Sequence, residues 1–453
     1  MIKFAVMGDM HYVQPRCHQN TLNGKPSGIT ELADTTRNYW MTRNTLPDVI
    51  SRIKALNPDF VIQTGDLVQG HCDSQEQSSL EMREAQELIS KIGSKIYYAM
   101  GTHDGVPGAK NSAHLYDLVY PAIGRALGYP VSNGYYKFLS GNSLFIVLDY
   151  TTYSRDLNQR EFLLEALAEG KNHQHVFVFA HPPVVPVARP FFTDYKFASD
   201  VGELLGQYHA DAYFCGHTHN QIASLHLFND NWIPQLKSSV LGYPDIPPAE
   251  AGNIRVLLPD PAASEIGWAY MEDSAPGWWF VTVNGSYVQA DWHVLHKGVM
   301  GALSWRSGEK PVFVKKPPAV RRFTTMPAAF DIKKIRLRAA GSGFIDSDNV
   351  QIFINDKPVG NLPYLEYFDC RQYLEIDTAF CSELSNVNTV KFTMPSVPCC
   401  IGGFVIEIQT DIGWLRSEPS AFYVNTSKWD QWNERTIKHV GKGEDIIANL
   451  IIS

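Results

Sequence analysis

The stretch IKFAVMGDMH at residues 2–11 runs from six mostly apolar residues into an aspartate and a histidine. Four later segments repeat this arrangement, with an apolar run that leads into Asp or His, and they lie at residues 59–66, 95–104, 175–181 and 212–219. Short runs rich in β-branched and aromatic residues, bounded by Gly or Pro, indicate buried strands of a parallel sheet. Because ligand sites in open α/β sheets lie beyond the carboxyl ends of the strands, the five segments predict one cluster of polar side chains.

The side chains that follow these strands supply two carboxylates and four imidazoles, from Asp9, His11, Asp66, His181, His217 and His219. This mixture suits Mn, Fe, Zn or Ni better than Ca or Mg, which prefer shells made only of oxygen. Six ligands are too many for one catalytic ion with an open position, but they fit two ions about 3.5–4 Å apart. Any one motif could equally be a core histidine or a helix-capping aspartate, whereas five in register favour a dinuclear metal site.

The order of the motifs is Asp-x-His, Gly-Asp, a third motif that ends in His-Asp, His, and Gly-His-x-His. This order resembles the signature of the calcineurin-like metallophosphoesterase superfamily over roughly residues 1–296. The resemblance implies a four-layer α-β-β-α sandwich. Apolar residues at helical spacing over residues 43–56 and 75–92 fit the crossovers between its parallel strands.

The resemblance also implies a role for each motif residue. The first metal would be held by Asp9, His11, Asp66 and His219. The second metal would be held by Asp66, His181 and His217, so that Asp66 bridges the two ions. His103 would lie beside the bound phosphate and either stabilise its charge or protonate the leaving oxygen, and Asp104 would adjust the imidazole if it reaches it.

One residue departs from the signature. The third motif reads Gly101-Thr102-His103-Asp104, and the superfamily carries Asn, a ligand of the second metal, at the position of Thr102. A Thr hydroxyl is a poorer neutral ligand than an amide carbonyl and has a shorter reach. The sequence therefore predicts a second metal site that is weak, completed by water, or empty in the isolated protein.

Two features indicate a branch within the superfamily. His181-Pro-Pro and Cys-Gly-His217-Thr-His219 are most similar to the small-molecule and cyclic-nucleotide phosphodiesterases. Gly65-Asp66 is followed by Leu-Val-Gln-Gly, without the acidic residue and Arg that phosphoprotein phosphatases carry there. The expected activity is therefore hydrolysis of a small phosphoester by metal-bound hydroxide, with phosphodiesters favoured over monoesters. The alternative is a non-catalytic or weakly active scaffold with a degraded second metal site, whose β-sandwich binds a ligand or partner.

Composition and charge argue against several classes of protein. The 453 residues carry a net charge of −8, which offers no general attraction for nucleic acid. The seven cysteines lack zinc-finger or redox-motif spacing, so reduced thiols are expected. No apolar run is long enough to cross a membrane, and the chain starts directly in its first strand. A soluble, cytoplasmic protein is expected, although a chain trimmed of an export signal would look the same. Its oligomeric state stays open.

The rest of the chain shows no second catalytic motif. Residues 297–325 are basic and Pro-rich and are interpreted as a linker. Residues 326–453 contain strand-like runs separated by turn signals, which predict an antiparallel β-sandwich. Residues 12–39 form a long polar segment expected to rim the metal site, and the sequence assigns no role to any residue in it. The predicted domains are thus a catalytic domain at 1–296, a linker and an accessory β-sandwich at 326–453.

Overall fold

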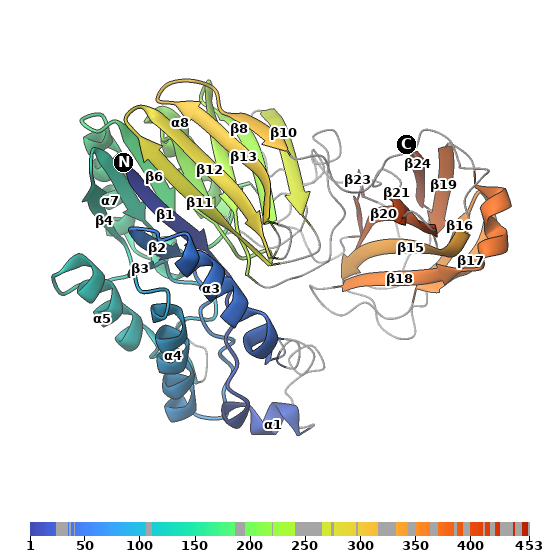
Figure 1. The fold of residues 1–453 in the computed structure, drawn as a ribbon, viewed down its shortest axis with the longest axis horizontal. Helices are drawn as coiled ribbons and strands as arrows, with labels where there is room; N and C mark the ends of the chain where they lie inside the picture. Colours follow the sequence, from blue (N-terminus) through green and yellow to red (C-terminus); the bar gives the residue numbers. More distant parts are fainter. Residues whose placement is uncertain are drawn as a thin grey trace. The chain divides into compact units, whose positions relative to one another are not determined.

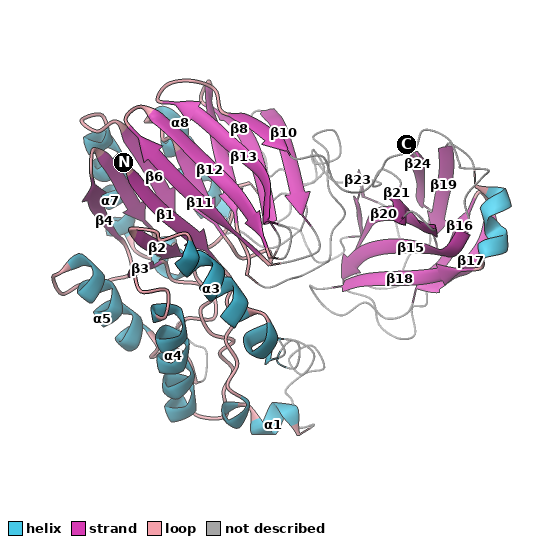
Figure 2. Cartoon of the chain, viewed as in Figure 1, coloured by secondary structure: helices cyan, strands magenta, loops and turns pink. Residues whose placement is uncertain are grey.

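The computed structural model describes the following residues: 1–23, 35, 38–39, 41–105, 111–185, 195–219, 221–240, 265–272, 276–295, 298–315, 332–342, 350–362, 370–384, 387–392, 399–410, 413–416, 422–425, 438–439 and 446–451. The described residues up to 315 form one compact unit, and those from 332 onwards form a second. Each unit contains its own pair of β-sheets (Figures 1 and 2).

The first sheet of the first unit begins the chain. Its strand order is β14-β13-β12-β11-β1-β2-β3, and β1, β2 and β3 run parallel to one another. The bounds are β1 Ile2–Met7, β2 Phe60–Gln63, β3 Lys95–Tyr98, β11 Gly277–Asn284, β12 Tyr287–Val294, β13 Gly298–Arg306 and β14 Val312–Lys315. The crossovers predicted between the parallel strands are confirmed as helices α3 (Leu46–Ala55) and α4 (Gln75–Ser90).

Helix α4 shows why the sequence folds this way. Ser74 precedes the helix, and its hydroxyl accepts a hydrogen bond from the backbone N–H of Gln77, which caps the first turn. Met82, Ala85 and Ile89 are buried and follow one another at helical spacing, so one face packs on the sheet.

The second sheet holds the later motif strands. Its order is β10-β8-β9-β7-β6-β5-β4, with β5, β6, β7 and β9 parallel to their neighbours in that run. The strand bounds are β4 Tyr136–Ser140, β5 Ser143–Val147, β6 His175–Phe179, β7 Ala212–Cys215, β8 Gln221–Phe228, β9 Asn231–Lys237 and β10 Glu265–Glu272. The helices are α1 Gln19–Leu22, α5 Tyr116–Leu127, α6 Tyr150–Tyr153, α7 Leu157–Gly170 and α8 Tyr195–Gln207, with a short 3-10 helix, η1, at Pro15–Cys17.

Aromatic side chains join the two sheets. Phe4 of β1 is fully buried, and its ring lies 5.3 Å from that of Phe145 and 6.0 Å from that of Phe214, in β5 and β7. Helices α4 and α5 contact β3, while α7 contacts β5 and β6. Helices therefore lie outside a pair of stacked sheets, which confirms the predicted four-layer α-β-β-α sandwich (Figure 1).

The second unit is built from β-strands. One sheet has the order β18-β15-β20-β22-β23, with β21 on β20, and the other has the order β17-β16-β19-β24. The bounds are β15 Ile332–Ser342, β16 Val350–Ile354, β17 Lys357–Leu362, β18 Cys370–Ile376, β19 Val387–Phe392, β20 Cys399–Thr410, β21 Gly413–Arg416, β22 Phe422–Asn425, β23 Lys438–His439 and β24 Ile446–Ile451, with a 3-10 helix, η3, at Thr378–Glu383. Pairing is antiparallel except between β22 and β23. Buried Leu337, Ile352 and Phe392 come from both sheets and share one core, consistent with the predicted β-sandwich.

The predicted linker differs from the structure in its first half. Residues 298–306 and 312–315 form β13 and β14. Strand β13 pairs with β12 and β14 pairs with β13, so both extend the first sheet. Buried and partly buried positions alternate along much of β13, as expected for a strand with one face turned towards solvent, and such a strand tolerates flanking Lys and Pro. Residues 316–325 of the predicted linker and the predicted boundary at His296 lie outside the described residues. Among the described residues, no helix combines the length and the apolar character that crossing a bilayer requires.

A buried histidine in β8 makes the stability of the first unit sensitive to pH. His226 is fully buried beside Ser224, and burial lowers its pKa from 6.5 to about 3. Below pH 6.5 the unfolded chain binds a proton that the folded chain does not, so the free energy of unfolding falls as pH falls towards 3. At pH 5 this loss is about 2 kcal/mol relative to pH 8. Urea denaturation at the two pH values should show a loss smaller by about that amount in His226→Gln, and equal losses in both proteins would contradict the assignment.

Candidate metal centre

The five motif loops leave their strands at one edge of the sandwich. Five of the six candidate ligands adopt a left-handed backbone conformation, with φ between 40° and 74°, and these are Asp9, His11, Asp66, His217 and His219. Asp and His adopt this conformation more readily than β-branched residues do, although at some cost in energy. The sharp turns bring the side chains of successive strands together.

Two glycines allow the second and third motif loops to touch. Gly65 has φ +100°, and a Cβ there would lie 2.6 Å from Nδ1 of His181. A Cβ on Gly101 would collide with the backbone of Asp66. The glycines of these two motifs are therefore required by close backbone approach, and alanine at either position would displace candidate ligands.

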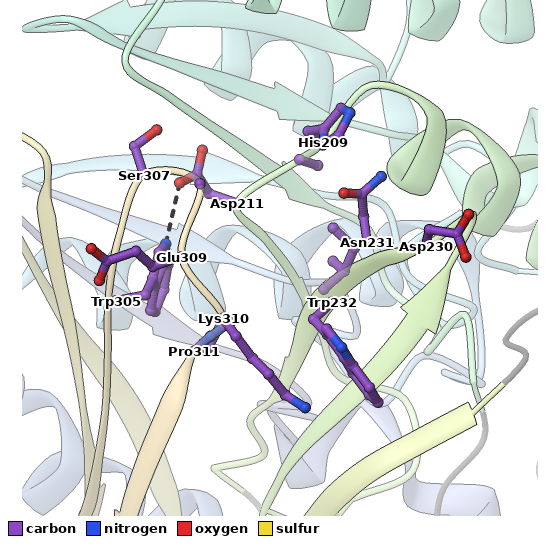
Figure 3. A pocket seen from close by; sticks show the side chains of 13 residues that line it. His209, Asp211, Asp230, Asn231, Trp232, Trp305, Ser307, Glu309, Lys310 and Pro311 are labelled. Carbon is purple, nitrogen blue, oxygen red and sulfur yellow. Dashed lines mark hydrogen bonds between the residues drawn. The ribbon is translucent and has the colours of Figure 1, made fainter.

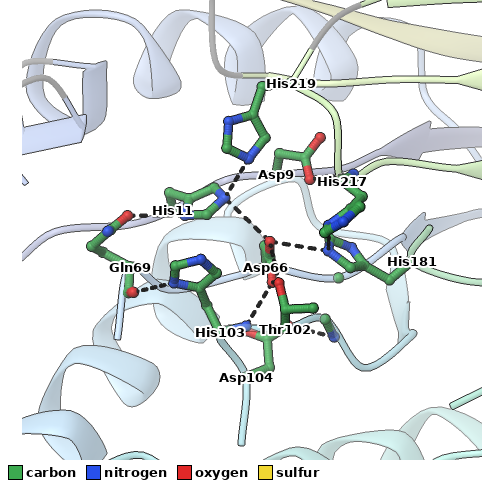
Figure 4. Close-up of polar contacts among 12 residues, drawn as sticks. Asp9, His11, Asp66, Gln69, Thr102, His103, Asp104, His181, His217 and His219 are labelled. Carbon is green, nitrogen blue, oxygen red and sulfur yellow. Dashed lines mark hydrogen bonds and ion pairs between the residues drawn. The ribbon is translucent and has the colours of Figure 1, made fainter. Parts of the chain in front are cut away.

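The first group of candidate ligands contains Asp9, His11, Asp66 and His219. One ligand atom from each lies within 4.8 Å of the others. His11 Nε2 lies 3.0 Å from His219 Nε2 and 3.3 Å from Asp66 Oδ2 (Figure 4). The structure thus brings together the four residues expected at the first metal.

The second group shares Asp66 with the first and adds His181 and His217. His181 Nε2 lies 3.0 Å from Asp66 Oδ2 and 3.0 Å from His217 Nδ1. The same carboxylate oxygen of Asp66 therefore contacts one imidazole of each group, as a bridging ligand would (Figure 4).

Carbonyl oxygens orient two of the imidazoles. His11 Nδ1 lies 2.9 Å from the side-chain oxygen of Gln69, and His181 Nδ1 lies 2.9 Å from the backbone oxygen of Thr64. A carbonyl oxygen can only accept a hydrogen bond, so each Nδ1 carries the proton and donates it. In the neutral imidazole this leaves the Nε2 lone pair directed at the cluster, which is the arrangement that metal-binding histidines use.

The charges of the cluster also fit cations. Burial raises the pKa of Asp9 to about 6, and Asp9 Oδ2 is buried without a hydrogen-bond partner among the described residues. Burial raises the pKa of Asp66 too, but His181, His103 and His11 outweigh that effect and hold it well below its usual value. Burial lowers the pKa of His181, whereas Asp66 and Asp9 raise it to about 9. The two buried carboxylates favour the binding of cations at this site. Because the other ligand atoms are imidazole nitrogens, the two groups suit transition-metal ions.

Gln69 is a functional candidate that the sequence reasoning missed. Its side-chain oxygen accepts hydrogen bonds from His11 Nδ1 and, at 2.6 Å, from the side-chain nitrogen of Asn38. Because 58 positions separate His11 from Gln69, no local pattern marks the pair. The only sequence signal was its place three residues after Asp66, in the motif loop.

Replacing this side chain should weaken the first metal site. Gln69→Leu removes the acceptor that orients His11, so the affinity for the first ion should fall by about 10–100-fold. A competition titration with a chromophoric chelator measures this affinity. Gln86→Leu, which removes an amide on α4 that bonds to the backbone of Leu118, is the matched control. Unchanged affinity in the Gln69 variant would show that its contact does not orient a ligand.

His103 and Thr102 lie against the same cluster. The His103 ring is 4.6 Å from that of His11, and its Nδ1 bonds to the backbone oxygen of Gln69. Burial lowers the pKa of His103 to about 3, so its imidazole is neutral near pH 7 with the proton on Nδ1. The hydroxyl of Thr102 lies 3.3 Å from Asp66 Oδ2, which places it beside the second group without making it part of that group.

The structure corrects the role expected for Asp104. Its carboxylate accepts hydrogen bonds from the backbone N–H groups of Leu67, at 2.8 Å, and Gly101, at 3.1 Å. The His103 ring instead bonds to the carbonyl of Gln69. Asp104 therefore holds the second and third motif loops together and does not adjust the imidazole. Burial raises its pKa to about 7.

The sequence of this region has a family match. Residues 2–221 match the family model described as calcineurin-like phosphoesterase. These residues belong to the calcineurin-like phosphoesterase family. The family depends on a dinuclear metal site, and the two Asp/His groups that share Asp66 contain the candidate metal ligands of this chain.

Solved structures similar to this chain share little sequence with it. A purple acid phosphatase from yellow lupin (Lupinus luteus) seeds is 16% identical with a TM-score of 0.43, and the match covers 70% of this chain and 54% of that one. A dimetal phosphatase from Danio rerio is 14% identical with a TM-score of 0.45, over 70% of this chain and 99% of that one. GAP50, the anchor in the inner membrane complex of Plasmodium, is 13% identical with a TM-score of 0.41, over 68% and 90%. No curated protein matched the chain.

A cavity of about 540 Å³ lies away from the Asp/His cluster, at the opposite end of β7 (Figure 3). Asp211, just before β7, accepts hydrogen bonds there from Trp305 Nε1 and, outside the cavity, from His175 Nδ1. Lys310 Nζ lies 3.7 Å above the ring of Trp232. These contacts hold the turn between β13 and β14 against the second sheet. A structural role therefore accounts for Asp211, Trp232, Trp305 and Lys310.

Proposed function

We propose that this protein is a metal-dependent phosphoric ester hydrolase that favours small phosphodiesters over phosphomonoesters. The observation that carries the proposal is the Asp66 carboxylate, which lies between two imidazole groups. The preference for diesters is supported by His181-Pro-Pro and Cys-Gly-His217-Thr-His219, the motifs most similar to phosphodiesterases.

Each residue of the cluster would have a defined role in this reaction. Asp9, His11, Asp66 and His219 would hold one ion, and Asp66, His181 and His217 the other. Two bound ions would activate water for attack on phosphorus and neutralise charge on the phosphoryl oxygens. His103 presents Nε2 with its lone pair, because Nδ1 donates to Gln69. A phosphate group beside Nε2 would raise the pKa of His103, so that the imidazole can hold a proton for the leaving oxygen.

A paired substrate panel tests the proposal. The protein would be freed of metal, reloaded separately with Mn, Fe, Zn or Ni, and assayed with bis(p-nitrophenyl) phosphate and p-nitrophenyl phosphate. We expect turnover that requires metal, with the higher kcat/KM for the diester. A higher value for the monoester would overturn the preference, and no turnover with any metal would favour the scaffold alternative.

Thr102→Asn tests the strength of the second site. An amide carbonyl reaches further than a hydroxyl and is the better neutral ligand, so the variant should retain more of the second ion after dialysis. Metal content per chain and turnover should rise together if hydrolysis needs both ions. Two tightly held ions in the unmodified protein, unchanged by the substitution, would show that Thr102 does not weaken the site.

A further inference from the structure

A second cluster of metal-ligand side chains is formed by the segment around η1, the residues that follow Gln69, and helix α4. It consists of Cys17, at the end of η1, His18, Cys72 and Glu81 of α4, and all four are at most 2% exposed. His18, Cys72 and Glu81 each offer one ligand atom within 4.8 Å of the others. Two thiols, an imidazole and a carboxylate form a donor set suited to zinc.

Two of the distances in this cluster are close to those between donors around a tetrahedral ion, and the third is shorter. For Zn–S and Zn–N bonds of about 2.3 and 2.0 Å, tetrahedral angles place sulfur and nitrogen about 3.5 Å apart, and sulfur and oxygen about the same distance. Cys72 Sγ lies 3.6 Å from His18 Nε2 and 3.4 Å from Glu81 Oε1. His18 Nε2 lies 2.6 Å from Glu81 Oε2, which is shorter than the ideal edge of about 3.3 Å and would have to lengthen.

Cys17 is the candidate fourth donor. Its thiol contacts that of Cys72, but its sulfur is not part of the group within 4.8 Å, so it would have to move closer to that group to bind the same ion. Four protein donors without an open position are typical of structural zinc sites, whereas catalytic sites keep a position for water. The burial of the cluster fits the closed type.

The backbone contacts of Glu81 are compatible with metal binding. Its two oxygens accept hydrogen bonds from the N–H groups of Gly70, at 3.2 Å, and Gln14, at 2.9 Å. A carboxylate has about four lone-pair sites, so each oxygen can accept a backbone N–H and still face an ion. These contacts join the segment after β1, the segment after β2 and helix α4.

We propose that Cys17, His18, Cys72 and Glu81 form a closed structural site for a tetrahedral divalent ion of the zinc type, separate from the Asp/His cluster. The ion fastens the segment around residues 14–18 and the loop at residues 65–72 onto α4. This site does not depend on the proposed hydrolase activity.

Thiolate ligation distinguishes this site from the Asp/His cluster, which contains no sulfur. In the unmodified chain reconstituted with Co²⁺, we expect a near-ultraviolet thiolate-to-cobalt charge-transfer band. In the zinc form, we expect an X-ray absorption signal for Zn–S bonds of about 2.3 Å. Asp66→Ala should lose ions from the Asp/His cluster yet keep both thiolate signals. A failure of the proposed hydrolase activity would leave the same signals intact.

Variants locate the sulfur ligands. Cys72→Ser and Cys17→Ser should each weaken or abolish the charge-transfer band, whereas Cys215→Ser, which alters another buried thiol, should keep it. Spectra of the unmodified chain with nitrogen and oxygen ligands alone would overturn the proposal, even if a variant failed to fold. A Cys17–Cys72 disulfide in non-reducing peptide mapping would overturn it as well.

Discussion

Asp66→Ala should remove both ions from the Asp/His cluster and lower turnover on the order of 10³-fold or more. Asp66 is the one residue common to both ligand groups, and its Oδ2 contacts His11 in one and His181 in the other. Loss of this carboxylate also leaves several buried imidazoles without their negative partner. Metal content by elemental analysis after gel filtration, together with kcat on an aryl phosphodiester, measures the effect.

Two further variants serve as controls for Asp66→Ala. His181→Ala removes a ligand of the second group alone, so it should lose mainly one ion. Asp211→Ala removes a carboxylate at the opposite end of β7, where it bonds to His175 and Trp305, and should keep both ions. Equal metal loss in Asp66→Ala and His181→Ala would rule out a bridging role.

His103→Ala should leave metal content unchanged while turnover falls by about 10²–10⁴-fold. His103 lies outside both ligand groups, and its ring faces His11 while its Nδ1 is tied to the backbone of Gln69. We therefore expect the loss of His103 to lower kcat and not the amount of bound metal. Paired measurement of kcat, KM and bound metal separates this role from ligation.

His71→Ala is the matched control for His103. His71 is exposed and follows β2, and its ring lies 5.4 Å from that of His103, which follows β3. His71 belongs to neither ligand group. Turnover should stay close to that of the unmodified protein. Loss of metal from His103→Ala would instead make His103 a ligand.

Much of the fold and of the candidate ligand cluster could be predicted from the sequence because both depend on local patterns. Each buried strand is a short apolar run, and the residue after it lies at the carboxyl edge of a parallel sheet. Asp9, Asp66 and His181 could therefore be assigned to one cluster before their contacts were known. The strands β13 and β14 were not predicted because flanking Lys and Pro suggested a linker, although β13 largely alternates between buried and partly buried positions.

Which residues support the ligands was decided only by the tertiary structure. Gln69 orients His11 across 58 positions, and Asp104 holds a backbone N–H 37 positions away instead of the neighbouring imidazole. The contact between His18 and Glu81 spans 63 positions, from a segment to which the sequence assigned no role. The sequence by itself determined the chemical types at the strand ends, because strand periodicity and side-chain chemistry are local properties. Partners from distant segments meet only when the sheets and helices pack, so their hydrogen bonds and the second cluster depended on the tertiary structure.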